Sequence, residues 1–123
     1  MADVRPRPAV WATPETEVPE LGQVSLIAKL TAKEGKRDEL LKVLRGLEVT
    51  VESEPGTLVY AVNASTTAPD EVWFYELYAD NDALAAHRGS AAMKEAGAAF
   101  ADLLAGRPEM FVLEPAGGKG LPG

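Results

Sequence analysis

Two side chains in this sequence could move a proton near neutral pH. Glu76 lies in the middle of the apolar segment Glu71 to Tyr78, where burial would raise the pKa of its carboxyl group and require a partner or a chemical role. His87 is the only histidine, and imidazole can accept or donate a proton at working pH. Tyr78 adds a phenolic hydroxyl with the same strand parity as Glu76. These three residues are therefore the catalytic candidates.

Each candidate also has an ordinary structural explanation. A single histidine on a helix is more often a packed side chain than a catalyst, and a buried carboxyl group can simply accept hydrogen bonds from a neighbour. Other chemistries have less support, because the sequence has no cysteine and one histidine, too few ligands for a transition-metal site. Glycine-rich phosphate loops and the GxSxG motif are also absent from the sequence. We therefore expect no metal, nucleotide or flavin cofactor.

The periodicity of apolar residues predicts the elements that must position these side chains. A helix over Lys36 to Ser53 would place Leu40, Leu44, Leu47 and Val51 on one stripe. A short helix through His87 and a second segment from Ser90, separated by Gly89, would follow the third strand. The expected strands are Val24 to Thr31, Thr57 to Asn63, Glu71 to Tyr78 and Glu109 to Glu114. The order β-α-β-β-α-β predicts an α+β, ferredoxin-like fold with helices on one face of an antiparallel sheet.

Length and composition set the frame for this fold. The 123 residues fit one domain, which we place at 23–115, between an irregular, proline-rich arm at 1–22 and a flexible, glycine-rich tail at 116–123. The net charge of -7, with scattered cations, argues against a nucleic-acid partner. No apolar run is long enough to span a membrane, and no secretory signal is expected. The absence of cysteine favours the reducing cytoplasm.

The third strand is bulky and apolar on both faces. Val72, Phe74, Glu76 and Tyr78 share one parity, and Trp73, Tyr75 and Leu77 share the other. Two helices can cover only one face of a ferredoxin-like sheet, so the second face would form an exposed apolar patch. We therefore expect a homodimer that pairs the free sheet faces. The alternative is that the arm around Trp11 folds over this face.

Four segments of the chain resemble the antibiotic biosynthesis monooxygenase (ABM) family over about residues 24 to 115. They are Glu54-Pro55-Gly56 with Leu58 and Tyr60, Tyr75 to Asp80, Ala83 to His87, and Leu104 to Pro108. The resemblance implies a dimeric α+β barrel with a pocket between sheet and helices. Family members include cofactor-independent monooxygenases of quinols and anthrones, haem-degrading enzymes and isomerases of a phosphorylated sugar derivative. The haem-degrading branch is disfavoured, because Ala28, Tyr78 and Gly97 occupy the positions of its Asn, Trp and His.

The resemblance favours a cofactor-free monooxygenase that oxidises a small aromatic or quinol-like substrate with dioxygen. His87 or Glu76 would be the base, and Tyr78 would orient the substrate anion by a hydrogen bond. The substrate-binding candidates are Tyr60, Phe74, Met93, Phe100 and Leu58. Two alternatives stay open: an isomerase of a small keto compound that uses the same residues, and a dimeric ligand-binding module without catalysis.

Overall fold

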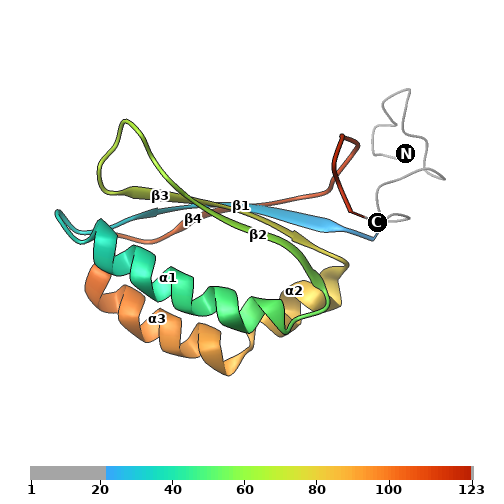
Figure 1. Ribbon diagram of the computed structural model, residues 1–123, viewed down its shortest axis with the longest axis horizontal. Helices are drawn as coiled ribbons and strands as arrows, with labels where there is room; N and C mark the ends of the chain where they lie inside the picture. Colours follow the sequence, from blue (N-terminus) through green and yellow to red (C-terminus); the bar gives the residue numbers. More distant parts are fainter. Residues whose placement is uncertain (1–21, 123) are drawn as a thin grey trace.

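The computed structural model describes residues 22–122. Its seven elements, drawn in Figure 1, are β1 (Val24–Thr31), α1 (Arg37–Glu52), β2 (Thr57–Ala64), β3 (Glu71–Tyr78), α2 (Asn81–Arg88), α3 (Ala91–Leu103) and β4 (Glu109–Leu113). The order agrees with the sequence prediction, including the division of the second helical region into two pieces. The expected N-terminal arm falls almost wholly outside the described residues.

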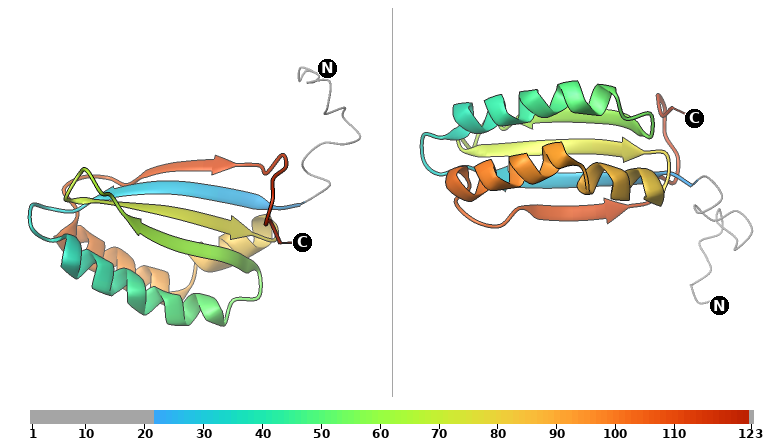
Figure 2. Two further views of the ribbon diagram at one scale, coloured as in Figure 1. Left: turned by 45° about the horizontal axis from the view of Figure 1, so that its top comes forward. Right: turned by 90° about the horizontal axis from the view of Figure 1, so that it is seen from below.

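The four strands form one antiparallel sheet in the order β2-β3-β1-β4. Figures 1 and 2 show the three helices on the same side of this sheet, with α1 and α3 running side by side. Leu40 and Leu44 on α1 are fully buried against the sheet, where Val72 on β3 is fully buried as well. The ferredoxin-like α+β fold is therefore confirmed.

The helix ends follow from local side-chain chemistry. The Asp80 carboxylate accepts a hydrogen bond from the backbone N–H of Ala83 and caps α2, and the Ser90 hydroxyl does the same for Met93 at the start of α3. These caps satisfy N–H groups that have no partner within a helix. Since α2 begins three residues after β3 ends, His87 on α2 is held close to the end of β3.

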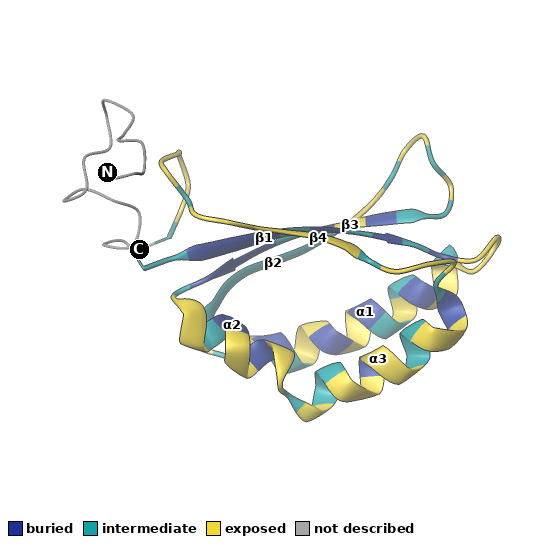
Figure 3. Ribbon diagram, turned by 180° about the vertical axis from the view of Figure 1, so that it is seen from behind, coloured by how far each residue is buried: buried dark blue, intermediate teal, exposed yellow. Residues whose placement is uncertain are grey.

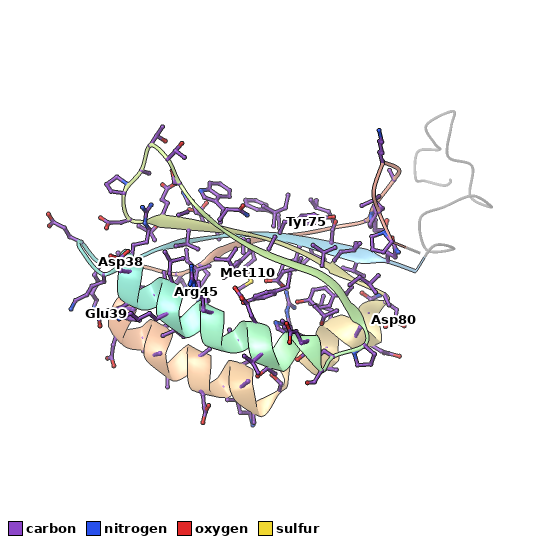
Figure 4. All side chains as sticks on the ribbon, viewed as in Figure 1. Asp38, Glu39, Arg45, Tyr75, Asp80 and Met110 are labelled. Atoms are coloured by element: carbon purple, nitrogen blue, oxygen red, sulfur yellow. The ribbon has the colours of Figure 1, made fainter. Side chains whose placement is uncertain are left out.

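The strand register separates two faces of the sheet. Leu26, Glu76 and Tyr60 are neighbours across β1, β3 and β2 on the face toward the helices. Ile27 on β1 is paired with both Tyr75 and Phe111 on the opposite face. Figure 4 shows Tyr75 on the side away from the helices and Met110 on the side facing them. The parity predicted for β3 is thus present in the sheet.

The face away from the helices is largely apolar, apart from the ion pairs of Lys29 with Glu71 and Glu109, and is only partly covered within the described chain. Trp73 is 37% exposed, and Phe111 and Leu113 are about half exposed. We call the patch formed by Ile27, Trp73, Tyr75, Phe111 and Leu113 the open face. Figure 3 shows the exposed outer surfaces of the helices and of β4 in yellow.

The ends of the described chain and the start of β2 complete the fold. Residues 115–122 form no helix or strand, although the Gln23 side-chain amide donates a hydrogen bond to the carbonyl of Pro122. A β-bulge separates Thr57 from Val59 in the pairing of β2 with β3, so Leu58 has no partner in the register. None of the helices among residues 22–122 is both long enough and apolar enough to cross a membrane.

Candidate active site

A cavity of about 180 Å³ lies between the sheet and the helices. Its wall is mostly aliphatic and aromatic, with Tyr60, Glu76, His87 and Arg88 as the ionisable members. The apolar wall residues are Leu26, Ala28, Leu30, Leu44, Leu47, Phe74, Leu84, Met93, Gly97, Phe100, Pro108 and Met110. An apolar pocket with a few convergent polar groups is the usual form of a small-molecule site.

Glu76 lies on β3 in the wall of this cavity and is 4% exposed. Its carboxyl group accepts a hydrogen bond from the Tyr78 hydroxyl two residues along the same strand face. Burial raises the pKa of Glu76, and this effect exceeds the opposing influence of the Tyr78 hydrogen bond and of positive charge at His87 and Arg88. Glu76 therefore lies on the cavity wall, and its carboxyl group stays protonated to a higher pH than that of an exposed glutamate.

Tyr78 lies behind Glu76, away from the cavity wall. Its side chain is fully buried with Val24, Leu26 and Leu84, and it is not one of the residues that line the cavity. Burial, together with the Glu76 hydrogen bond, raises the pKa of the Tyr78 phenol. The sequence predicts that this hydroxyl orients the substrate, whereas in the structure it donates a hydrogen bond to the Glu76 carboxyl group. The Tyr78 hydroxyl and the Glu76 carboxyl group are thus joined by a hydrogen bond on one face of β3.

His87 lies on α2 and is 5% exposed. Its ring Nδ1 is 2.9 Å from Oε1 of Glu54, and its ring centroid is 5.6 Å from that of Tyr78 and 6.2 Å from that of Tyr60. No hydrogen bond to Nε2 from another residue of the described chain is present. His87 therefore lies beside the Tyr78 end of β3, as the short connection after that strand predicts.

Glu54 is a site residue that the sequence interpretation missed. It belongs to the turn between α1 and β2, and the hydroxyl of Thr57 donates to the same Oε1 at 2.8 Å. In the sequence, the Glu54-Pro55-Gly56 segment stands out only as part of the family resemblance. A carboxylate placed just after a helix gives no local sign that it meets a histidine 33 residues later.

The expected substrate-binding residues divide into two groups. Tyr60, Phe74, Met93 and Phe100 all line the cavity, whereas Leu58 does not. Simple alternation would place Leu58 on the same face of β2 as Tyr60. The β-bulge at Leu58 interrupts this alternation. Burial, followed by the charge of Glu76, raises the pKa of Tyr60, which keeps its hydroxyl protonated as a potential donor.

The part of the chain that the structure describes contains no cluster of side chains that could bind a metal ion. No group of three or more His, Cys, Asp or Glu side chains is placed to hold a metal ion there. Proton transfer, hydrogen bonding and exclusion of water are the chemical functions that the cavity residues themselves can supply.

The fold and cavity define a small ferredoxin-like α+β protein with an apolar site under its sheet. The sequence profile of the antibiotic biosynthesis monooxygenase family matches residues 23–99. The chain therefore belongs to this family. A search of curated proteins found no match to the sequence.

Solved structures support the same assignment. A protein from Caulobacter crescentus, provisionally described as an antibiotic biosynthesis monooxygenase, is 36% identical, with a TM-score of 0.75 over 79% of this chain and 92% of its own. A Chloroflexus aurantiacus protein with the same provisional description is 29% identical, with a TM-score of 0.70 over 81% and 99%. Rv0793 from Mycobacterium tuberculosis is 26% identical, with a TM-score of 0.73 over 79% and 98%. The family and its fold are therefore shared with these proteins.

Proposed function

We propose that this protein is a cofactor-independent monooxygenase that oxidises a small quinol-type aromatic substrate with dioxygen. The observation that carries the proposal is the placement of His87, held by Glu54, in the wall of a mostly apolar cavity beside Glu76. Family membership supports monooxygenation as the class of reaction. A cavity of about 180 Å³ is below the usual range of about 300 to 1,000 Å³ for ligand pockets, which favours a small substrate.

The reaction begins with loss of a substrate proton. His87 would accept the proton of a quinol hydroxyl, and the resulting anion is electron-rich enough to react with dioxygen. Apolar walls such as Phe74, Met93 and Phe100 exclude water from the anion and the reduced oxygen species. The neutral form of Glu76 can donate a hydrogen bond to a developing negative charge.

The atoms and electrons of this reaction balance without a further reductant. A ring carbon of the anion bonds to dioxygen, and His87 returns the proton to give a hydroperoxide. Loss of the hydrogen on that carbon, with cleavage of the O–O bond, releases water and leaves a carbonyl group. One oxygen atom enters the product, the other leaves as water, and the substrate supplies all four electrons.

A dihydroxynaphthalene is a suitable probe for this activity. We expect dioxygen uptake by the purified full chain with a chelator present and without added flavin. His87→Ala should slow the uptake by roughly 10²-fold or more, because general base catalysis typically contributes that much.

The matched control is Asp82→Ala, an exposed position on the same helix, which should keep the wild-type rate. Equal rates for His87→Ala and wild type would remove His87 from the mechanism, and no uptake with any such quinol would contradict the proposed activity.

The same proposal includes a homodimer formed through the open face. Ile27, Trp73, Tyr75, Phe111 and Leu113 form an apolar surface across three strands, bordered by the ion pair of Lys29 with Glu109, and monomers seldom expose such a patch. A second copy of the chain presents the same surface, so a two-fold pairing of sheets would cover both. We place this dimer in the reducing cytoplasm, because the chain has no cysteine.

A further inference from the structure

Two polar groups, the Thr57 hydroxyl and the His87 ring, converge on one oxygen of the Glu54 carboxylate. Oε1 lies 2.8 Å from the Thr57 hydroxyl and 2.9 Å from Nδ1 of His87. An ionised carboxylate has acceptors only, and a neutral imidazole carries hydrogen on one nitrogen at a time. The hydrogen of a neutral His87 ring must therefore be on Nδ1 for this contact to be a hydrogen bond.

The turn that carries Glu54 is fixed to the elements around it. The backbone N–H of Thr57 donates to the Glu54 carbonyl at 3.1 Å, and the N–H of Ala79, just after β3, donates to the Gly56 carbonyl at 2.8 Å. These two bonds tie the turn to the end of the strand that carries Glu76. The carboxylate is thus presented from a backbone with little freedom to move.

The turn also packs directly against the helix that carries His87. A Cβ atom added at Gly56 would lie 2.5 Å from Cβ of Ala83, closer than two such atoms can approach. Gly56 therefore allows the turn to contact α2 one helical turn before His87. Glu54 and His87 are held at a set separation by this close packing as well as by their own hydrogen bond.

We propose that Glu54 is a positioning residue that fixes His87 in the Nδ1–H tautomer and so leaves Nε2 as the basic nitrogen. The inference rests on the proposed function only in that it makes His87 the base. Nε2 is hydrogen-bonded to no other residue of the described chain, and His87 lines the cavity. A carboxylate behind a histidine sets which ring nitrogen is basic and how the ring is turned. Loss of the carboxylate behind a metal-bound histidine typically costs about 10- to 100-fold in activity, and we expect a loss of the same order here.

The single histidine makes the tautomer directly measurable. In the full chain labelled with ¹⁵N-histidine, a two-dimensional ¹H–¹⁵N spectrum of the ring contains signals from His87 alone. At a pH at which the ring is neutral, we expect Nδ1 to show the shift of a protonated ring nitrogen and Nε2 that of an unprotonated one. A wild-type spectrum dominated by the Nε2–H form, or averaged between both forms, would overturn the inference.

Two substitutions remove the acceptor without adding another polar group. In Glu54→Ala and in Glu54→Met, we expect the Nδ1–H population to fall and the rate of oxygen uptake at saturating quinol to drop about 10- to 100-fold. The control is Glu52→Ala, which removes an equal charge from an exposed position two residues earlier and should leave both spectrum and rate unchanged. Either folded Glu54 variant decides the test, and a spectrum identical to that of the wild type would contradict the positioning role.

These outcomes separate this inference from the proposed activity. If no quinol is oxidised but the neutral ring is Nδ1–H and depends on Glu54, the proposed activity fails and the positioning role holds. If quinol oxidation requires His87 but the wild-type ring is Nε2–H, the activity holds and the role of Glu54 fails.

Discussion

The strand β3 presents different kinds of side chain on the two faces of the sheet. On the face toward the helices, β3 presents Glu76 and the Tyr78 hydroxyl, two polar groups that are nearly or wholly buried. On the open face, the same strand presents Trp73 and Tyr75 next to Ile27 and Phe111. The polar groups thus lie where water is excluded, whereas large apolar groups lie where the described chain leaves them partly exposed.

This contrast indicates where each face obtains its partner. A buried carboxyl group costs free energy unless it is hydrogen-bonded, and Tyr78 supplies that bond from within the same chain. Apolar side chains on the open face gain free energy only if another surface covers them, by roughly 25 cal/mol per Å² of area buried. The covered face therefore has the features of a chemical site, and the open face has those of an interface.

The largest expected effect comes from placing a charge on the open face. Tyr75→Lys would bury a lysine ammonium against an apolar partner surface, a cost of several kcal/mol. We expect the dimer at micromolar concentration to be lost, with light scattering reporting the 13.1 kDa of one chain. The matched control is Val49→Lys on α1, since Val49 is 73% exposed, and this variant should remain dimeric.

Other results would contradict this assignment of the open face. A wild-type mass of one chain at micromolar concentration would rule out the dimer. An unchanged dimer in Tyr75→Lys would mean that a different surface forms the contact. Loss of the dimer in Val49→Lys as well would show that the helices, rather than the open face, contribute to the interface.

The covered face predicts a pH-dependent effect of intermediate size. The ordinary pKa of a glutamate is 4.5 and that of Glu76 is raised by burial, so between these two values the native state binds more protons than the unfolded state. The free energy of unfolding therefore falls as the pH rises through this range. Glu76→Gln keeps an oxygen that can accept the Tyr78 hydrogen bond but does not ionise.

Chemical denaturation at a series of pH values measures this effect. The variant should gain stability relative to the wild type as the pH rises above 4.5, by about 1.4 kcal/mol for each unit by which the native pKa is raised, and the gain should then level off. Glu95→Gln, at an exposed position on α3, is the control. Its free energy of unfolding should vary with pH as that of the wild type does. Parallel curves for Glu76→Gln would show that its carboxyl group ionises alike in both states.

The sequence predicted the division between these faces because strand alternation is a local property. Glu71–Tyr78 is a strand with the predicted bounds, and its parity places Glu76 under the helices and Tyr75 on the open face. The helical stripe that includes Leu40 and Leu44 on α1 was readable for the same reason, since a repeat of 3.6 residues needs no knowledge of distant contacts.

The missing parts of the site depend on contacts that no periodicity encodes. Glu54 meets His87 across 33 residues, through a turn whose glycine permits close packing on α2. The Tyr78 hydroxyl was predicted to face a substrate, because the sequence gives parity but not the direction of a hydrogen bond. Leu58 was placed by simple alternation, which a β-bulge interrupts. Long-range packing and local irregularity therefore set the limits of the sequence interpretation.

The smallest expected effect sharpens the account of the covered face and concerns Gly97 on α3. A Cβ atom at this position would meet no other atom within 4 Å, and Gly97 lines the cavity. Gly97→Ala should therefore stabilise the protein by about 0.5 to 1 kcal/mol, because alanine restricts the unfolded chain and favours the helix.

Gly46 on α1 also has free space around its Cβ position but does not line the cavity, so Gly46→Ala is the matched control with a similar gain in stability. Only Gly97→Ala should raise KM for the quinol, since its methyl group takes space from the substrate. Thermal denaturation and oxygen-uptake kinetics measure the two effects, and an equal KM in both variants would show that the substrate does not reach the α3 wall of the cavity.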